Sequence, residues 1–134
     1  MYEPINRIKT IEKKIILIET IINKYDGKIS KALEGEVQAR PAILMHLVSI
    51  AEQINKLKDE NAFEILESFS KTDLKGMYDV RNFIAHDYDG VDLAIIENVL
   101  RYGLDSLKNS IEKIEKSKWN ENSTSKIALW EWRI

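Results

Sequence analysis

The spacing of apolar residues constrains this chain most, because they recur three and four positions apart over most of its length. The clearest stripe comprises Ile8, Ile11, Ile15, Ile18 and Ile22, with lysine and glutamate filling many of the positions between them. This spacing gives an α-helix one apolar face, whereas a half-buried β-strand would alternate apolar and polar residues. Only five glycines and two prolines interrupt 134 residues. The sequence therefore predicts an all-α fold.

Five helical segments are predicted from this spacing, over residues 4–25, 37–58, 62–69, 74–86 and 92–116. A single helical turn is a further expectation for residues 28–35. Gly27 follows the first segment, where a left-handed residue commonly ends a helix. Pro41 lies near the start of the second segment, so that helix either begins there or kinks there.

Polar residues ahead of the last two segments are expected to accept hydrogen bonds from the first free N–H groups of each helix. Thr72 or Asp73 fits this role in the fourth segment, and Asp89 or Asp92 fits it in the fifth. The inward positions of the fifth segment are expected to be Ile95, Val99, Tyr102, Leu107, Ile111 and Ile114.

Long helices joined by short connections are typical of an up-and-down bundle. We expect a four-helix bundle with an additional short helix over residues 1–116, and a C-terminal tail over residues 117–134. The tail holds Trp119, Trp130 and Trp132, which are all the tryptophans of the chain. It either folds back to cap the bundle or forms a partner-binding arm. Because a core of this size is limited, burial in a homodimer would add stability.

Composition excludes several classes of protein. The chain has no cysteine, which excludes disulfides, zinc–thiolate sites and cysteine nucleophiles, and its two histidines do not favour a metal site. Charged residues interrupt every apolar stretch, and the N-terminus does not resemble a secretion signal, so we expect a cytoplasmic protein without a membrane partner. The net charge of −2 means that any RNA contact would depend on a local basic patch.

Residues 81–88, which read RNFIAHDY, concentrate the candidate chemistry. Arg81 falls among apolar positions of its segment, where an unpaired charge is costly, and Glu52 of the second segment is its expected partner. On an ideal helix the five-residue step to His86 separates the two side chains by about 140°. Either the helix loosens before His86, or two copies of the segment meet across a dimer axis. A structural alternative is that His86 only satisfies carbonyls at its helix end.

The spacing of Arg81 and His86 matches the Arg-x4-His motif of the HEPN superfamily. Tyr88 extends it to Arg-x4-His-x-Tyr, which resembles the HepT-type ribonuclease toxins. Asn82 and Asp87 also match the usual string around the motif. Residues 50–52, Ile-Ala-Glu, resemble the Gly-Glu element of the family's second helix, with alanine in place of glycine. The resemblance covers residues 5–114 and leaves the tail outside.

This resemblance implies a four-helix bundle that dimerises with its motifs facing each other, and a metal-independent endoribonuclease that needs no cofactor. His86 would be the general acid or base that assists attack of a ribose 2′-hydroxyl on the adjacent phosphate, because an imidazole ordinarily titrates near neutral pH. Arg81 would bind the scissile phosphate. Asn82, Glu52 and Asp87 would support these two groups.

In the HepT branch the motif tyrosine accepts AMP from a partner nucleotidyltransferase antitoxin of the MntA type, and Tyr88 matches that position. The added anionic nucleotide would block RNA. Two alternatives are a non-catalytic nucleotide- or partner-binding subunit of a minimal nucleotidyltransferase, and a dimerisation bundle without activity. His46 lies near Ile43 and Leu47 and is expected to be a half-exposed core or interface histidine.

Overall fold

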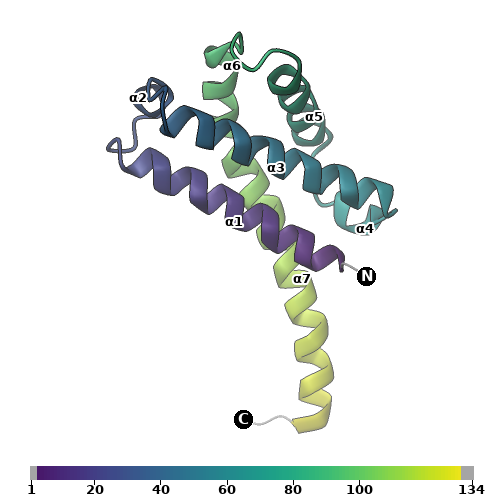
Figure 1. Ribbon diagram of the computed structural model, residues 1–134. Helices are drawn as coiled ribbons and strands as arrows, with labels where there is room; N and C mark the ends of the chain where they lie inside the picture. Colours follow the sequence, from purple (N-terminus) through teal and green to yellow (C-terminus); the bar gives the residue numbers. More distant parts are fainter. Residues whose placement is uncertain (1–2, 131–134) are drawn as a thin grey trace.

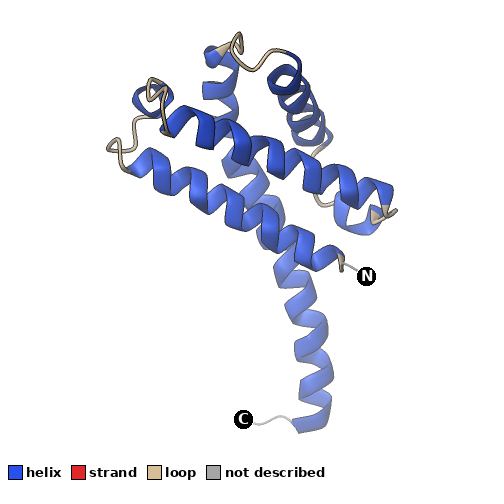
Figure 2. Ribbon diagram, in the orientation of Figure 1, coloured by secondary structure: helices blue, strands red, loops and turns tan. Residues whose placement is uncertain are grey.

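The computed structural model describes the backbone of residues 3–130 and the side chains of residues 3–117. Every regular element in that part is helical, with no strand (Figure 2). The all-α prediction is therefore confirmed, and residues 28–35 contain the expected short helix. The elements in chain order are α1 (Pro4–Asn23), α2 (Ile29–Leu33), α3 (Ala39–Asp59), α4 (Phe63–Leu66), α5 (Lys71–His86), α6 (Leu93–Asn98), the π-helical turn η1 (Val99–Gly103) and α7 (Leu104–Trp130).

The helices surround one core (Figure 1). Helices α1 and α3 lie side by side and run in opposite directions, and α5 packs against α3. Helix α7 contacts α1 and crosses behind the α1–α3 pair instead of running alongside it. The up-and-down arrangement expected from the sequence thus holds for α1 and α3, whereas α7 departs from it. The expected homodimer stays a prediction.

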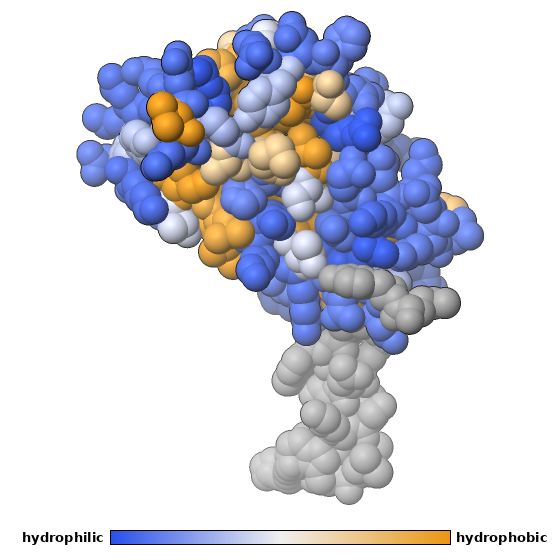
Figure 3. All heavy atoms as spheres, in the orientation of Figure 1, coloured by the Kyte–Doolittle hydropathy of each residue, from blue (hydrophilic) through white to orange (hydrophobic). Residues whose placement is uncertain are grey.

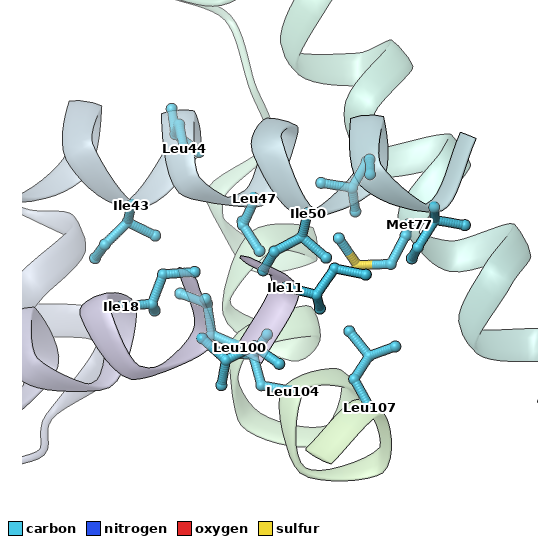
Figure 4. Close-up of a cluster of buried hydrophobic side chains, with 14 of the residues drawn as sticks. Ile11, Ile18, Ile43, Leu44, Leu47, Ile50, Met77, Leu100, Leu104 and Leu107 are labelled. Atoms are coloured by element: carbon cyan, nitrogen blue, oxygen red, sulfur yellow. The ribbon is translucent and has the colours of Figure 1, made fainter. Parts of the chain in front are cut away.

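The core is built from the apolar stripes that the sequence predicts. All five isoleucines of the α1 stripe are buried. In Figure 4, Ile11 and Ile18 of α1 lie opposite Ile43, Leu47 and Ile50 of α3. The other core side chains labelled there are Leu44 of α3, Met77 of α5, and Leu100, Leu104 and Leu107 of the last helical stretch. Burial of each such side chain stabilises the fold by about 1.5–3 kcal/mol before the cost of ordering the chain.

Two predictions about helix ends are confirmed. Gly27 has φ of +74°, and its N–H donates to the carbonyl of Ile22, so it ends α1 in the left-handed region. Pro41 is the third residue of α3, within the first turn, where a backbone N–H has no intrahelical acceptor. The helix therefore begins beside Pro41.

The start of α5 corrects one prediction and the start of α6 decides another. Helix α5 begins at Lys71, and Ser70 is its capping residue in place of Thr72 or Asp73, since the Ser70 hydroxyl accepts from the Asp73 N–H at 3.0 Å. The sequence carried this signal as serine followed three residues later by an acidic side chain. At α6 the Asp92 carboxylate accepts from the backbone N–H of residue 94 at 2.9 Å, which selects Asp92 over Asp89.

The inward face before α7 differs from the expected one. Ile95 and Tyr102, both predicted to point inward, are 38% and 67% exposed, whereas Ile96, Leu100 and Leu104 are buried. The cause is the π-helical turn η1, which takes more residues per turn than an α-helix. Ile96, Leu100 and Leu104 can therefore all point inward although they are four residues apart. In an α-helix of about 3.6 residues per turn, repeated steps of four would drift away from the core.

Helix α7 continues to Trp130, well past residue 116 where the sequence predicted its end. In Figure 1 this part extends away from the bundle instead of folding back over it. The interpretation of the tail through Trp119, Trp130 and Trp132 concerns side chains outside the described part of the chain. Among the described residues, no helix is both long and apolar enough to pass through a membrane.

Candidate active site

Arg81 of α5 is held by an ion pair with Glu52 of α3. Its Nε donates to Glu52 Oε1 at 2.8 Å, and its Nη1 donates to Asn82 Oδ1 at 3.3 Å. The Arg81 and Glu52 side chains are 39% and 38% exposed, so the pair lies at the edge of the α3–α5 contact. The contact between Arg81 and Glu52 predicted from the sequence is confirmed.

One edge of the Arg81 guanidinium remains available. A guanidinium carries five N–H groups and cannot accept a hydrogen bond. No side chain or carbonyl in the described part of the chain accepts from Nη2 of Arg81. Glu52 therefore fixes the arginine from the α3 side, while the remaining donors can meet an anion from solvent, with the fork geometry that suits a phosphate.

His86 is the last residue of α5 and is exposed. The helix stays regular up to this point, and the N–H of Asp87 still donates to the Phe83 carbonyl at 3.2 Å. The expected loosening before His86 is therefore not observed, and within one chain Arg81 and His86 leave different sides of α5. No described residue hydrogen-bonds to the imidazole, so the structural role suggested for it, satisfying carbonyls at the helix end, is not seen either.

The turn after His86 is fixed by Asp87 and Gly90. The Asp87 Oδ1 accepts from the Gly90 N–H at 3.0 Å, and a Cβ at Gly90 would collide with the same carboxylate. The absence of a Cβ at Gly90 lets the carboxylate come this close to the backbone. Asp87 therefore holds the backbone of the turn between His86 and α6 in place through this hydrogen bond.

A cavity of about 490 Å³ opens beside His86, between the end of α5 and the start of α6. Its walls include residues that the sequence did not single out, and the lining is Asn82, Phe83, His86, Asp87, Gly90, Val91, Asp92, Ile95 and Ile96. The signal that could have found Phe83 is its place in the motif segment, three residues before His86 and therefore next to it on the helix surface.

Tyr88 lies in a different recess although it is only two residues from His86. A hollow of about 180 Å³ is formed there with the start of α3, and it includes Arg40, Pro41 and Leu44. The tyrosine is exposed, and Arg40 also pairs with Glu36 at 3.4 Å. The structure thus groups Arg81 with Glu52 and Asn82, and places Tyr88 in a separate hollow.

The other histidine, His46, is half-buried on α3, as expected of a core-edge side chain. Burial, and then the positive charge of Lys14, lower its pKa below the ordinary value. In the described part of the chain, no three acidic or histidine side chains gather as a metal site would require.

The region that holds these residues matches a known family. Residues 11–114 match the model of a family described as Ribonuclease HepT-like. The matched region spans the Arg81–Glu52 pair, the cavity beside His86 and the hollow at Tyr88. Comparisons with curated proteins and with solved structures gave no match. Because the family model covers well over half of the sequence, the chain belongs to the Ribonuclease HepT-like family.

Proposed function

We propose that this protein is a metal-independent endoribonuclease toxin that acts at Arg81 and His86. The observation that carries this proposal is the Arg81 guanidinium, which Glu52 and Asn82 hold while its Nη2 stays without an acceptor among the described residues. An exposed imidazole follows on the same helix. Membership of the Ribonuclease HepT-like family supports RNA as the substrate.

In the proposed reaction, Arg81 binds the oxygens of the scissile phosphate and stabilises the charge that develops on them. The ribose 2′ oxygen forms a bond to phosphorus while the bond from phosphorus to the 5′ oxygen breaks. His86 either takes the proton of the 2′-hydroxyl or gives a proton to the leaving 5′ oxygen. The products are a cyclic phosphate and a 5′-hydroxyl end, and no step requires a metal ion.

A second copy of the chain completes the proposed site. Within one chain the regular α5 aims Arg81 and His86 in different directions, so each groove takes its arginine and histidine from different protomers. Exposed Met45 lies two turns from Glu52 on α3, and exposed Tyr78 lies one turn before Arg81 on α5. Figure 3 shows a hydrophobic band over α1 and α3 on an otherwise mostly hydrophilic face. Light scattering should give twice the chain mass, and Tyr78→Glu should lower it.

Tyr88 is the proposed point of control by a partner nucleotidyltransferase of the MntA type. Its phenol oxygen would attack the α-phosphate of ATP and release pyrophosphate, leaving AMP on the tyrosine. The exposure of Tyr88 gives a partner access to it, and Arg40 in the same hollow offers a cation for the new phosphodiester. The bound anion would repel RNA from the neighbouring groove.

A second candidate is a non-catalytic subunit that binds such a nucleotidyltransferase. The net charge of −2 favours it, as do the two carboxylates of Asp87 and Asp92 in the cavity beside His86, because they repel a polyanion. The two candidates differ in whether the isolated protein cuts RNA.

The deciding experiment expresses the wild type, Arg81→Ala and His86→Ala without a partner, and assays each purified protein on RNA. We expect growth arrest and RNA cleavage from the wild type, and a loss of at least about a hundredfold in each variant. Arg101→Ala is the matched control, because Arg101 is exposed and pairs only with Glu97 of the same helical stretch among the described residues. Wild-type cleavage by His86→Ala would refute the catalytic assignment.

Modification is tested separately by mass spectrometry after co-expression with the partner. Added AMP should be found on the wild type and be lost in Tyr88→Phe. Tyr102→Phe removes the hydroxyl of a more exposed tyrosine outside the hollow and should leave the modification unchanged. AMP that persists on Tyr88→Phe would place the modification elsewhere.

A further inference from the structure

The cavity beside His86 has a volume and a lining that suit one flat, uncharged ring. We propose that it binds the base of the nucleotide next to the scissile phosphate and so determines where RNA is cut. The proposal rests on the ribonuclease function proposed above. A volume of about 490 Å³ lies in the range of small-molecule sites and accommodates one base with part of its ribose.

Two exposed apolar side chains form the walls of this cavity. Phe83 lies three residues before His86, so the two side chains are neighbours on one face of α5. Phe83 is 47% exposed and Ile95, opposite it on α6, is 38% exposed. A base inserted between them would remove apolar surface from water on both of its faces. Stacking on an aromatic side chain is a general way in which proteins hold an unpaired RNA base.

The position of Ile95 follows from the π-helical turn described above. With Ile96 and Leu100 turned into the core, the side chain of Ile95 lines the cavity and stays partly exposed. The register of the last helical stretch therefore supplies one wall of the cavity. Ile95 contributes an apolar surface there without weakening the core.

Charge decides which part of a nucleotide can enter. Asp87 and Asp92 line the cavity, and two carboxylates repel a phosphate while they can accept from the N–H groups of a base. The Oδ1 of each already accepts a backbone N–H, from Gly90 and Ala94 respectively, which fixes both side chains in place. Because carboxylates only accept, the cavity favours adenine, cytosine and guanine, whose exocyclic amino groups each offer two N–H donors, over uracil, which offers only its N3–H.

Asn82 lies between the base cavity and Arg81 of the same chain. Its side chain lines the cavity, and its Oδ1 accepts from Nη1 of Arg81. The anion-binding group and the apolar cavity therefore lie on either side of one amide. A nucleotide whose base enters the cavity keeps its phosphate outside, beside His86, where the proposed dimer brings the arginine of the second copy.

The test compares Phe83→Ala with Phe63→Ala, a matched control because Phe63 is also an exposed phenylalanine but lies on α4. Single-turnover cleavage is measured on short RNAs that differ only in the base beside the cut. We expect wild type and Phe63→Ala to cut amino-bearing bases faster than uracil. Phe83→Ala should cut them about tenfold more slowly and show no base preference, while Phe83→Tyr should keep both rate and preference.

A second measurement separates this proposal from the ribonuclease function. Binding of the uncharged nucleosides adenosine, guanosine, cytidine and uridine is followed by saturation-transfer NMR, which needs no cleavage. If the wild type does not cut RNA but binds amino-bearing nucleosides through Phe83, the enzyme proposal fails and the base site stands. If RNA is cut with the same base preference by wild type and Phe83→Ala, the base site is overturned and the enzyme proposal stands.

Discussion

Two arginines, Arg7 of α1 and Arg81 of α5, contact α3 from opposite sides of the fold. Arg7 is almost fully buried. Arg7 of α1 donates from Nε to Glu60 Oε1 at 3.0 Å and from Nη2 to Glu60 Oε2 at 2.5 Å. Its Nη1 donates to Gln53 at 3.1 Å, and the side chain is only 11% exposed. All three nitrogens are therefore engaged, which fixes the end of α3 against the start of α1.

The second arginine, Arg81 of α5, makes fewer contacts with the same helix. Glu52 accepts from its Nε alone, and the 39% exposed side chain keeps Nη2 toward solvent. The chemical groups are the same at both places, an arginine and a glutamate. Geometry and burial separate an arginine that holds two helices together from one that can still take up an anion.

The largest effect expected from this comparison is on activity, in Arg81→Met. Cleavage should fall by about a hundredfold or more, because the cation at the phosphate is lost. The free energy of unfolding should change by less than about 1 kcal/mol, because a half-exposed pair contributes little to stability. Single-turnover cleavage and urea denaturation measure the two quantities. A large loss of stability would make Arg81 resemble Arg7 and would break the comparison.

The reverse result is expected from Arg7→Met. The free energy of unfolding should fall by about 2 kcal/mol, because a buried side chain that joins two helices is replaced by one that cannot donate. Cleavage per folded molecule should stay at the wild-type level. Urea denaturation followed by an RNA assay under folded conditions tests both, and a selective loss of cleavage would contradict the assignment of Arg7 to the fold alone.

A smaller effect is expected from Glu52→Gln. The amide keeps the size of the carboxylate and can still accept from Arg81 Nε, but the loss of charge lets the guanidinium move, so cleavage should slow by about tenfold. The melting temperature should hardly change. Glu60→Gln is the matched control, since it alters the other arginine pair and should leave the cleavage rate intact. Equal rates for wild type and Glu52→Gln would show that Arg81 needs no fixed partner.

The smallest effect is the pH dependence of the Arg7–Glu60 pair. The hydrogen bond from Arg7 lowers the pKa of Glu60 below its ordinary value of 4.5, and burial opposes this only in part. A carboxyl group whose pKa is lower in the folded state stabilises the fold at pH values above its ordinary pKa. This stabilisation is lost as the pH falls through the lowered pKa. The stability difference between wild type and Glu60→Gln should therefore shrink below about pH 4.5. A constant difference would show that charge contributes nothing.

Much of the fold and part of the candidate site follow from local spacing. The isoleucine stripe of α1 is buried as predicted, and Glu52 pairs with Arg81 because a charge beside an apolar helix face requires a partner. Of the inward positions predicted before α7, Ile95 and Tyr102 were wrong, because the spacing of an α-helix does not reveal the π-helical turn. Phe83 and Ile95 were not recognised as cavity walls, since a cavity depends on how far apart two helices lie.

The sequence by itself determined which residues share a helix face, because the turn of an α-helix sets the spacing of neighbours along the chain. From this alone, Arg81 and His86 had to leave different sides of a continuous α5. Only the tertiary structure decided that Arg7 is enclosed while Arg81 keeps a free edge, and that a cavity opens beside His86. Burial and cavities arise where segments far apart in sequence meet, and local periodicity carries no information about those distances.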